Sequence, residues 1–323
     1  MGNRDCCVCD RPAGPGAREL GGRWYCAAHY ERMMRDRPGL WQAGVAEIAG
    51  LLILVGFVEL ILGVTRPQLQ GTGLALASVA IALVPALVWL SFFYQQDRLE
   101  PEPKGYVLAV FVLGGLLAAA VGLPLTQDLF RTADWLGSSP WVNLLGSILV
   151  VGFGYEFLKY AAVRYFVYPL DEFDERVDGI IYGTAAGLGF ATALNIHYVL
   201  QSGGVDLGAG IIHVVIAALA QASFAGVTGY FLGRRKFQRQ PMWWTPAGLS
   251  LAAALNGLFT FFAGQVTRGG IRLQGGGGYT PWPGLALATV VAVAVFALLN
   301  LLIRRANQQT LAQGNASGAG GVE

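Results

Sequence analysis

The feature that most constrains this chain is a series of apolar runs, each close to the ~20 residues that a helix needs to cross a bilayer. With 54% of its 323 residues hydrophobic and only 13% charged, the composition excludes one large soluble domain. We therefore predict an all-α fold, a polytopic membrane bundle of about eight transmembrane helices. The runs cover approximately residues 43–64, 71–94, 105–126, 141–168, 179–200, 209–233, 246–266 and 282–303.

Lys and Arg residues outside these runs are distributed unevenly. Sixteen lie in the N-terminus, the even-numbered loops and the C-terminus, and four lie in the odd-numbered loops. The positive-inside rule then places both termini in the cytoplasm. The basic loop 234–240, followed by Trp243 and Trp244, fits a cytoplasmic anchor with an aromatic belt in the lipid bilayer. No nucleic-acid partner is expected.

Residues 1–38 form a separate, polar and arginine-rich segment that holds every cysteine of the chain. Cys6 and Cys9 form one pair of potential ligands, and Cys26 and His29 form a second pair sixteen residues further on. This spacing is typical of a closed, structural Zn²⁺ site, and so short a segment needs such a staple to fold. We predict a zinc-ribbon or treble-clef-like module on the cytoplasmic side of the membrane, which could dock a cytoplasmic protein.

Two alternatives to this module are a disordered tail with incidental cysteines and a different ligand register. In the second case Cys7, the spare cysteine, would exchange with Cys6. A disulfide framework is disfavoured because a histidine stands where a fourth paired cysteine would be needed. The chain thus divides into the module 1–38, an eight-helix transmembrane domain 39–305, and a Gln, Gly and Ser-rich tail 306–323 that we expect to be disordered.

Three acidic side chains and one lysine interrupt the apolar runs. Glu156 and Lys159 are three residues apart and share one helix face, so the pair indicates either a functional site or a buried structural pair that fixes helix packing. Glu47 and Glu59 lie in the first run. Glu47 is expected at the interface, whereas Glu59 is costly unless it is protonated or paired across a helix contact.

Two stretches of the chain carry a resemblance to a known family. Residues 97–103 read DRLEPEP, and residues 172–193 begin EFDERVDGIIYGTAAGLGFA, a helix whose small residues permit close approach of another helix. Both are similar to the PrsW family of intramembrane proteases, which are relatives of the CAAX-processing proteases. The resemblance covers most of residues 85–265 and implies a site within the membrane to which Glu156, Lys159 and Asn195 carry over.

The chain departs from that family at four positions. Where the family has a glutamate pair ahead of the lysine, the first position is Tyr155, and where it has a glutamate before the asparagine, the residue is Leu194. Gln221 and Asn256 stand where the family has histidines. These amides form hydrogen bonds but transfer no proton at neutral pH. The resemblance therefore implies a degenerate catalytic site.

His197 and His213 are the remaining candidates for the missing imidazoles. Both are predicted near the outer ends of their spans, where they could face each other, whereas Glu156 lies about 15 Å deeper at 1.5 Å of rise per residue. Neither is therefore expected to reach Glu156.

We accordingly predict a pseudoprotease that binds transmembrane or membrane-anchored clients without cleaving them, in a bacterial inner membrane. One alternative is an active endopeptidase that uses Glu156 in a rearranged site. Another is an ion or proton transporter that uses Glu59, Glu156 and Lys159.

Overall fold

The computed structural model describes residues 11–20, 23–34, 71–96, 102–201 and 207–269 continuously, with single positions and short pieces within 5–9, 53–64 and 286–308. Predictions for Cys7, Glu47, Glu59 and the tail 306–323 fall outside the described residues, apart from one helical position in the tail. The first predicted span, 43–64, is likewise described only at isolated positions.

The N-terminal module is a β-hairpin followed by a short helix. Strands β1 (Arg18–Leu20) and β2 (Arg23–Tyr25) pair antiparallel, with Arg18 opposite Tyr25, and α1 (Ala27–Met34) follows directly. Its buried apolar side chains among the described residues are only Cys6, Ala13 and Tyr25. Hydrophobic burial of three side chains is small, so the module needs a further source of stability.

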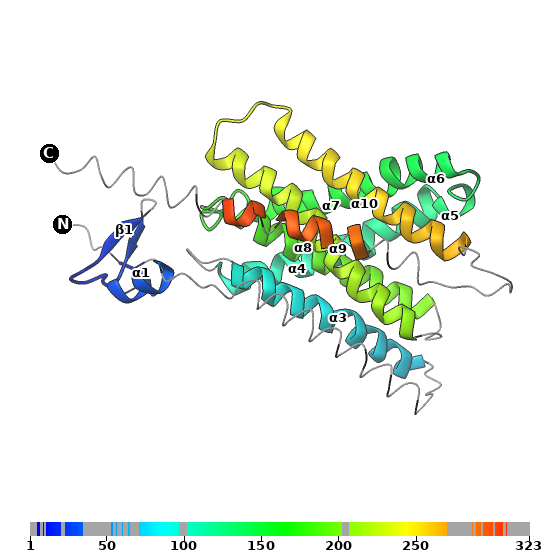
Figure 1. Cartoon of the computed structure of the whole chain (residues 1–323), viewed down its shortest axis with the longest axis horizontal. Coiled ribbons are helices and arrows are strands. Elements are labelled where there is room, and N and C mark those ends of the chain that lie inside the picture. The colour runs from blue at the N-terminus through cyan, green and yellow to red at the C-terminus, as the bar shows by residue number, and fades with distance from the viewer. Residues whose placement is uncertain are drawn as a thin grey trace.

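Helices make up the rest of the described chain (Figure 1). In chain order they are α3 (Gly71–Gln96), α4 (Lys104–Leu117), η1 (Ala118–Gly122), η2 (Leu125–Leu129), α5 (Thr132–Trp135), α6 (Pro140–Gly146), η3 (Ser147–Gly152), α7 (Phe153–Ala162), η4 (Val163–Val167), α8 (Asp178–Gln201), α9 (Leu207–Phe237) and α10 (Trp244–Gly269).

Six stretches of the described chain are long and apolar enough to cross a membrane, which confirms an all-α integral membrane protein. They coincide with the second to seventh predicted runs. The eighth predicted run, 282–303, is described mainly from residue 293 onward, where it is helical. The six stretches are Gly71–Gln95, Lys104–Leu129, Pro140–Val167, Asp178–Gln201, His213–Phe237 and Trp244–Phe262.

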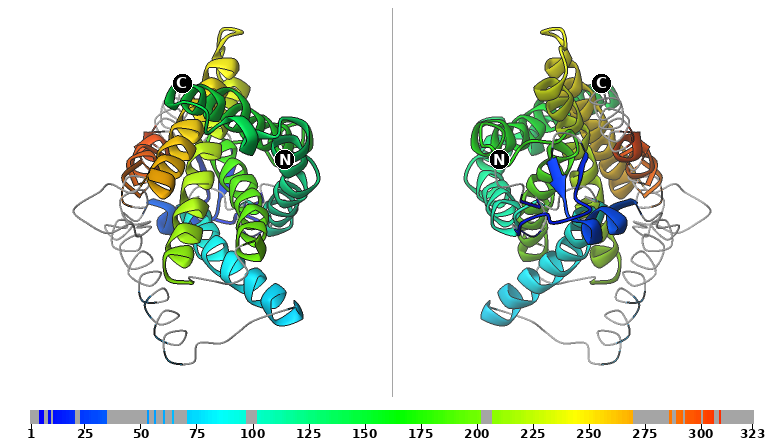
Figure 2. Two further views of the ribbon diagram at one scale, coloured as in Figure 1. Left: turned by 90° about the vertical axis from the view of Figure 1, so that its right-hand side faces the viewer. Right: turned by 90° about the vertical axis from the view of Figure 1, so that its left-hand side faces the viewer.

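Helix α8 lies at the centre of the bundle. In its most apolar window 83% of the residues are buried, against 28% for Gly71–Gln95, because α3, α4, α7 and α9 all pack on it (Figure 2). Glycines make this crowding possible. A Cβ on Gly189 would lie 1.7 Å from the carbonyl oxygen of Phe111 in α4, and one on Gly229 in α9 would lie 1.8 Å from that of Gly179. The small residues predicted to permit close helix approach therefore do so on two sides of α8.

The span Pro140–Val167 alternates between α-helical and π-helical turns. It begins at Ser139, whose hydroxyl caps the helix by accepting a 3.2 Å hydrogen bond from the Val142 amide. The π-helical stretches η3 and η4 then flank α7 on either side. A π turn holds one more residue than an α turn and is frequent at functional sites. Helix α7 carries Glu156 and Lys159, and the third charged residue of this span, Arg164, lies in η4.

Hydrogen bonds between distant segments define the two ends of the bundle. At one end, the Tyr182 hydroxyl donates to Glu102 Oε2 at 2.5 Å, and Lys236 Nζ donates to the Tyr168 carbonyl at 2.8 Å. The first bond joins the beginnings of α4 and α8, and the second joins the end of α9 to the residue after η4. We call this the Glu102 end. At the opposite end, Gln127 Nε2 lies 2.8 Å from His197 Nε2.

Candidate functional site

Four polar side chains from three helices meet inside the bundle. Glu156 and Lys159 come from α7, Gln221 from α9 and Asn256 from α10, and their relative exposures are 0%, 1%, 5% and 0%. All four lie within membrane-spanning stretches. We call this group the polar cluster. The sequence prediction named all four residues, and the structure brings them together.

Hydrogen bonds connect every member of the polar cluster. Lys159 Nζ donates to Glu156 Oε1 and, at 2.7 Å, to Gln221 Oε1. Asn256 Nδ2 donates to Glu156 Oε1 at 2.7 Å and lies 3.2 Å from Gln221 Oε1. Gln221 Nε2 completes the ring with a 3.3 Å bond to Asn256 Oδ1. The ring ties α7, α9 and α10 together, and its ammonium group donates to two side-chain oxygens.

One polar atom of the polar cluster lies outside this hydrogen-bonded ring. Glu156 Oε2 is buried and has no hydrogen-bond partner among the described residues. A buried carboxylate oxygen without a donor is costly, so this oxygen is the place where a proton, a water molecule or a bound group would be stabilised.

The other predicted site residues lie outside this ring. The Tyr155 hydroxyl is 3.3 Å from Thr126 Oγ1, and its ring packs on Phe190 with a centroid separation of 4.9 Å. Asn195 Nδ2 donates to the Val214 carbonyl at 3.1 Å, which links α8 to α9. Leu194 is half-buried. No described hydrogen bond joins any of these three residues to the polar cluster.

The two histidines in the spans have separate surroundings. His197 lies against Gln127, as described above, and the His213 ring packs on Tyr198 with a centroid separation of 4.7 Å. Neither is hydrogen-bonded to the polar cluster in the described part of the chain. This arrangement agrees with the expectation that neither histidine supplies the missing imidazole.

Sequence reasoning missed the bond between Tyr182 and Glu102, although both residues lie in the two stretches that carry the family resemblance. Glu102 is also held through its carbonyl, which accepts a 3.0 Å bond from the Tyr94 hydroxyl. At the same end of the bundle, Asp178 closes the turn that precedes α8. Its Oδ2 accepts hydrogen bonds from the amides of Asp174 at 2.7 Å and Glu175 at 2.5 Å. The sequence signal that could have suggested the bond between Tyr182 and Glu102 is that both residues lie in the stretches that resemble the family.

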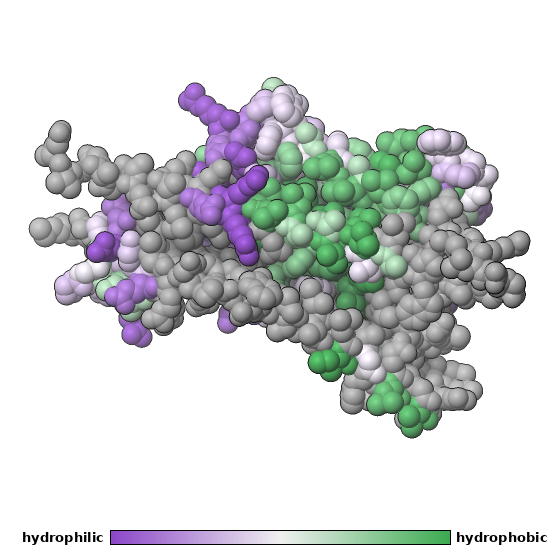
Figure 3. Space-filling view, viewed as in Figure 1, coloured by the Kyte–Doolittle hydropathy of each residue, from purple (hydrophilic) through white to green (hydrophobic). Residues whose placement is uncertain are grey.

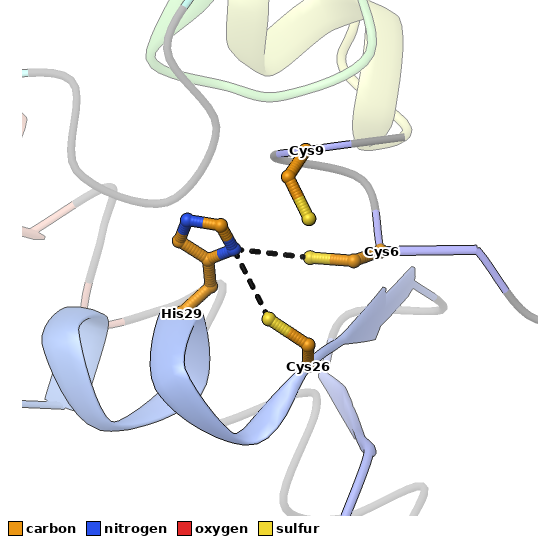
Figure 4. A group of neighbouring side chains, drawn as sticks. All are labelled: Cys6, Cys9, Cys26 and His29. Carbon is orange, nitrogen blue, oxygen red and sulfur yellow. Dashed lines mark hydrogen bonds between the residues drawn. The ribbon is translucent and has the colours of Figure 1, made fainter. Parts of the chain in front are cut away.

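A second group of side chains is suited to a metal. Cys6, Cys9, Cys26 and His29 place one potential ligand atom each within 4.8 Å of one another (Figure 4). His29 Nδ1 lies 3.4 Å from Cys6 Sγ and 3.2 Å from Cys26 Sγ. The hairpin and α1 position Cys26 and His29, whereas Cys6 and Cys9 sit on a turn closed by a 3.3 Å bond from the Cys9 amide to the Cys6 carbonyl. The cluster can hold one metal ion.

The surroundings of Cys9 in this Cys/His cluster favour the protonated form of its thiol. A backbone hydrogen bond with Arg11 lowers the pKa of the Cys9 thiol, but burial and the neighbouring Cys6 and Cys26 thiols raise it, and the net pKa lies above the ordinary value. A metal ion must displace the thiol proton, so metal binding releases protons.

These observations define the class of the protein: an integral membrane protein of helical spans with a buried, hydrogen-bonded charged cluster and an N-terminal Cys/His module. Residues 102–299 match the family described as PrsW family intramembrane metalloprotease. The chain belongs to the PrsW family.

Curated relatives agree with this assignment. A Geobacillus kaustophilus protein named Protease PrsW is 33% identical over 159 residues, which are 49% of this chain and 67% of the relative. A Bacillus subtilis protein of the same name is 31% identical over 191 residues, covering 57% of this chain and 82% of the relative. No solved structure matches the chain.

The family description implies a metal, and the side chains of the polar cluster are poorly suited to hold one. The cluster offers one carboxylate and two amides, and the ammonium of Lys159 already bonds the carboxylate oxygen Glu156 Oε1 and the amide oxygen Gln221 Oε1. Catalytic zinc sites use three protein ligands, mainly imidazole and carboxylate. Within the described residues, the Cys/His cluster is the one group of His, Cys, Asp or Glu side chains close enough to share a metal. The polar cluster does not fit a catalytic metal.

Proposed function

We propose that this PrsW-family protein binds transmembrane or membrane-anchored client segments without cleaving them. The observation that carries the proposal is the hydrogen-bonded ring of the polar cluster, in which the one carboxylate is paired with Lys159 and held by Asn256. The clients are membrane-embedded proteins or peptides, because the family site lies among the spans.

Peptide hydrolysis requires an activated water, a proton donor for the leaving amine and stabilisation of the oxyanion. Glu156 supplies one carboxylate, and the ammonium of Lys159 neutralises it. Gln221 and Asn256 donate and accept hydrogen bonds but do not transfer protons at neutral pH. The residues of the ring therefore provide neither a second carboxylic acid nor an imidazole for proton transfer. Their hydrogen bonds instead hold three helices together.

We also propose that the Cys/His cluster holds a structural Zn²⁺. Three thiolates and one imidazole form a closed tetrahedral set that leaves no open position for substrate. When bound, the ion supplies folding free energy and no catalysis. The module is then a small rigid element, suited to docking a cytoplasmic protein.

The alternative function is an active endopeptidase that uses Glu156. Two observations favour it: Glu156 Oε2 has no described hydrogen-bond partner, and the curated relatives are named as proteases. The transporter alternative is less well supported, because Glu156 and Lys159 are engaged with each other and Glu59 lies outside the described residues.

Cleavage assays decide between these functions. We expect that neither the wild type nor Glu156→Gln cuts any single-span substrate, because loss of general acid-base assistance alone typically costs about 10²- to 10⁴-fold in rate. The substrates should be spans that the Bacillus subtilis relative cuts in the same membranes, with crosslinking as the measure of binding. Cleavage by the wild type but not by the Glu156→Gln variant would establish the endopeptidase and refute our proposal.

We further propose a bacterial inner-membrane location with both termini in the cytoplasm, on the basis of the positive-inside distribution of Lys and Arg. A cytoplasm-active reporter fused after Glu323 should be active, and the same reporter fused near Gly204, in an odd-numbered loop, should be inactive. Activity that appears only with a periplasm-specific reporter after Glu323 would reverse the orientation.

A further inference from the structure

The turn between α9 and α10 exposes a group of basic and apolar side chains at the Glu102 end of the bundle. Arg235 and Arg239 are exposed, and Met242 and Trp243 have relative exposures of 87% and 63%. Arg235 lies in the last turn of α9, and Arg239 lies in the connection that directly follows this helix. We call these four residues the turn patch.

Among the described residues, the guanidinium groups of the turn patch make few bonds compared with their basic neighbours. Arg234 donates to Gln238 Oε1 at 2.9 Å and to the Tyr230 hydroxyl at 3.0 Å, and Lys236 donates to two backbone carbonyls. Arg235 makes one described bond, a long one of 3.4 Å to the Met242 carbonyl. For Arg239 the described residues provide no hydrogen bond or ion pair. Two guanidinium groups are therefore available to an external anion.

The sequence around the turn patch provides no counter-charge. No Asp or Glu occurs between Asp206 and Glu323, although the chain has 20 acidic residues. The exposed arginine at the opposite end of the bundle is different, because Arg131 pairs with Asp134 at 2.6 Å. In space, Asp171 and Asp178 lie close enough to act on Lys236, but no Asp or Glu of the described residues forms an ion pair with Arg235 or Arg239.

The position of the turn patch indicates the kind of anion. Trp244 packs on Phe231 with a centroid separation of 4.6 Å and donates through Nε1 to the Phe231 carbonyl at 3.2 Å, and Trp243 lies beside it with a centroid separation of 6.2 Å. Tryptophan side chains of this kind sit at the headgroup level of a bilayer. Figure 3 shows hydrophilic side chains gathered at one end of the bundle, directly beside a broad apolar band over its middle.

We propose that the turn patch binds the headgroup of an anionic phospholipid. The forked donors of Arg235 and Arg239 fit the phosphate oxygens in a bidentate manner, which a single lysine ammonium does not match. Trp243 and Met242 lie against the glycerol and upper acyl region. The exposed apolar side chains favour a lipid over a soluble phosphate or a nucleic acid, neither of which would cover them.

Native mass spectrometry of the full chain in detergent tests this proposal. The protein is titrated with phosphatidylglycerol and with phosphatidylcholine of the same acyl chains. The wild type should retain phosphatidylglycerol preferentially. Each arginine near an anionic headgroup accounts for about fivefold in affinity, so Arg235→Gln with Arg239→Gln should weaken phosphatidylglycerol binding about 25-fold and leave phosphatidylcholine binding unchanged.

Two further variants control for charge and position. Arg131→Gln removes an exposed arginine at the opposite end and should leave the lipid preference intact, and Lys replacements at positions 235 and 239 should retain part of it. Equal binding of the two lipids by the wild type would overturn the proposal. So would a preference that survives in the double glutamine variant, or displacement of phosphatidylglycerol by a large excess of inorganic phosphate.

Discussion

Replacing Lys159 with methionine will lower the free energy of unfolding of the membrane-spanning bundle by about 3–5 kcal/mol. Methionine nearly matches the volume of lysine, so the loss comes from the missing charge rather than from a cavity. Glu156, which is fully buried, would keep only its bond from Asn256, and Gln221 would lose its 2.7 Å donor. A buried carboxylate without its counter-charge is strongly destabilising.

Denaturant or thermal unfolding of the full chain in detergent micelles measures this effect. The double variant Lys159→Met with Glu156→Gln should recover much of the loss, because a buried pair replaced on both sides is often nearly neutral. Arg131→Gln, which removes an exposed ion pair, should change stability by less than about 1 kcal/mol. If Lys159→Met lowers the free energy of unfolding by no more than Arg131→Gln does, the polar cluster does not hold the helices together.

Removal of metal will unfold the N-terminal module and leave the membrane-spanning bundle folded. Structural zinc sites of this kind contribute about 10–16 kcal/mol, and three buried apolar side chains cannot replace that contribution. We expect one zinc ion per chain in the purified full-length protein and none after Cys26→Ser. Trypsin should cut at Arg18 and Arg23 rapidly in the variant and slowly in the wild type.

Cys7→Ser is the matched control for this experiment, because the Cys/His cluster is complete without Cys7. This variant should keep its zinc and its resistance to trypsin. Two zinc ions per chain, one of them retained after Cys26→Ser, would show a second metal site outside the Cys/His cluster and would contradict this prediction.

Much of this fold could be predicted from the sequence, because the membrane imposes simple constraints on length and composition. Six predicted runs coincide with helices that can span a bilayer, since each needs ~20 apolar residues whatever its neighbours are. The four-residue helix α5 and the π-helical stretches were not predicted, because they depend on tertiary contacts. For example, a Cβ on Gly146 would lie 2.5 Å from the Trp135 ring.

The candidate sites were predictable to different degrees. The Cys/His cluster follows from spacing alone, because two residues between ligands suit one tetrahedral ion. Family positions identified Gln221 and Asn256, but only the structure shows that both bond directly to the charged pair, across 62 and 100 positions of sequence. Asn195 was grouped with them by family position, yet it bonds the Val214 backbone. Sequence correspondence identifies positions without revealing their hydrogen-bond partners.

The π-helical stretches on either side of α7 have a consequence for how this span tolerates change. Successive residues of an α-helix are rotated by about 100°, so one extra residue taken up in η3 turns everything after it by that angle. The direction in which the side chains of α7 point is therefore set by η3 and does not follow directly from the direction of the side chains of α6. An insertion or deletion of one residue in η3, which precedes α7, would re-aim Glu156 relative to α6, whereas one in η4 would turn only the residues that follow α7. The direction in which Glu156 and Lys159 point can accordingly change while the two ends of the span keep their depth in the bilayer.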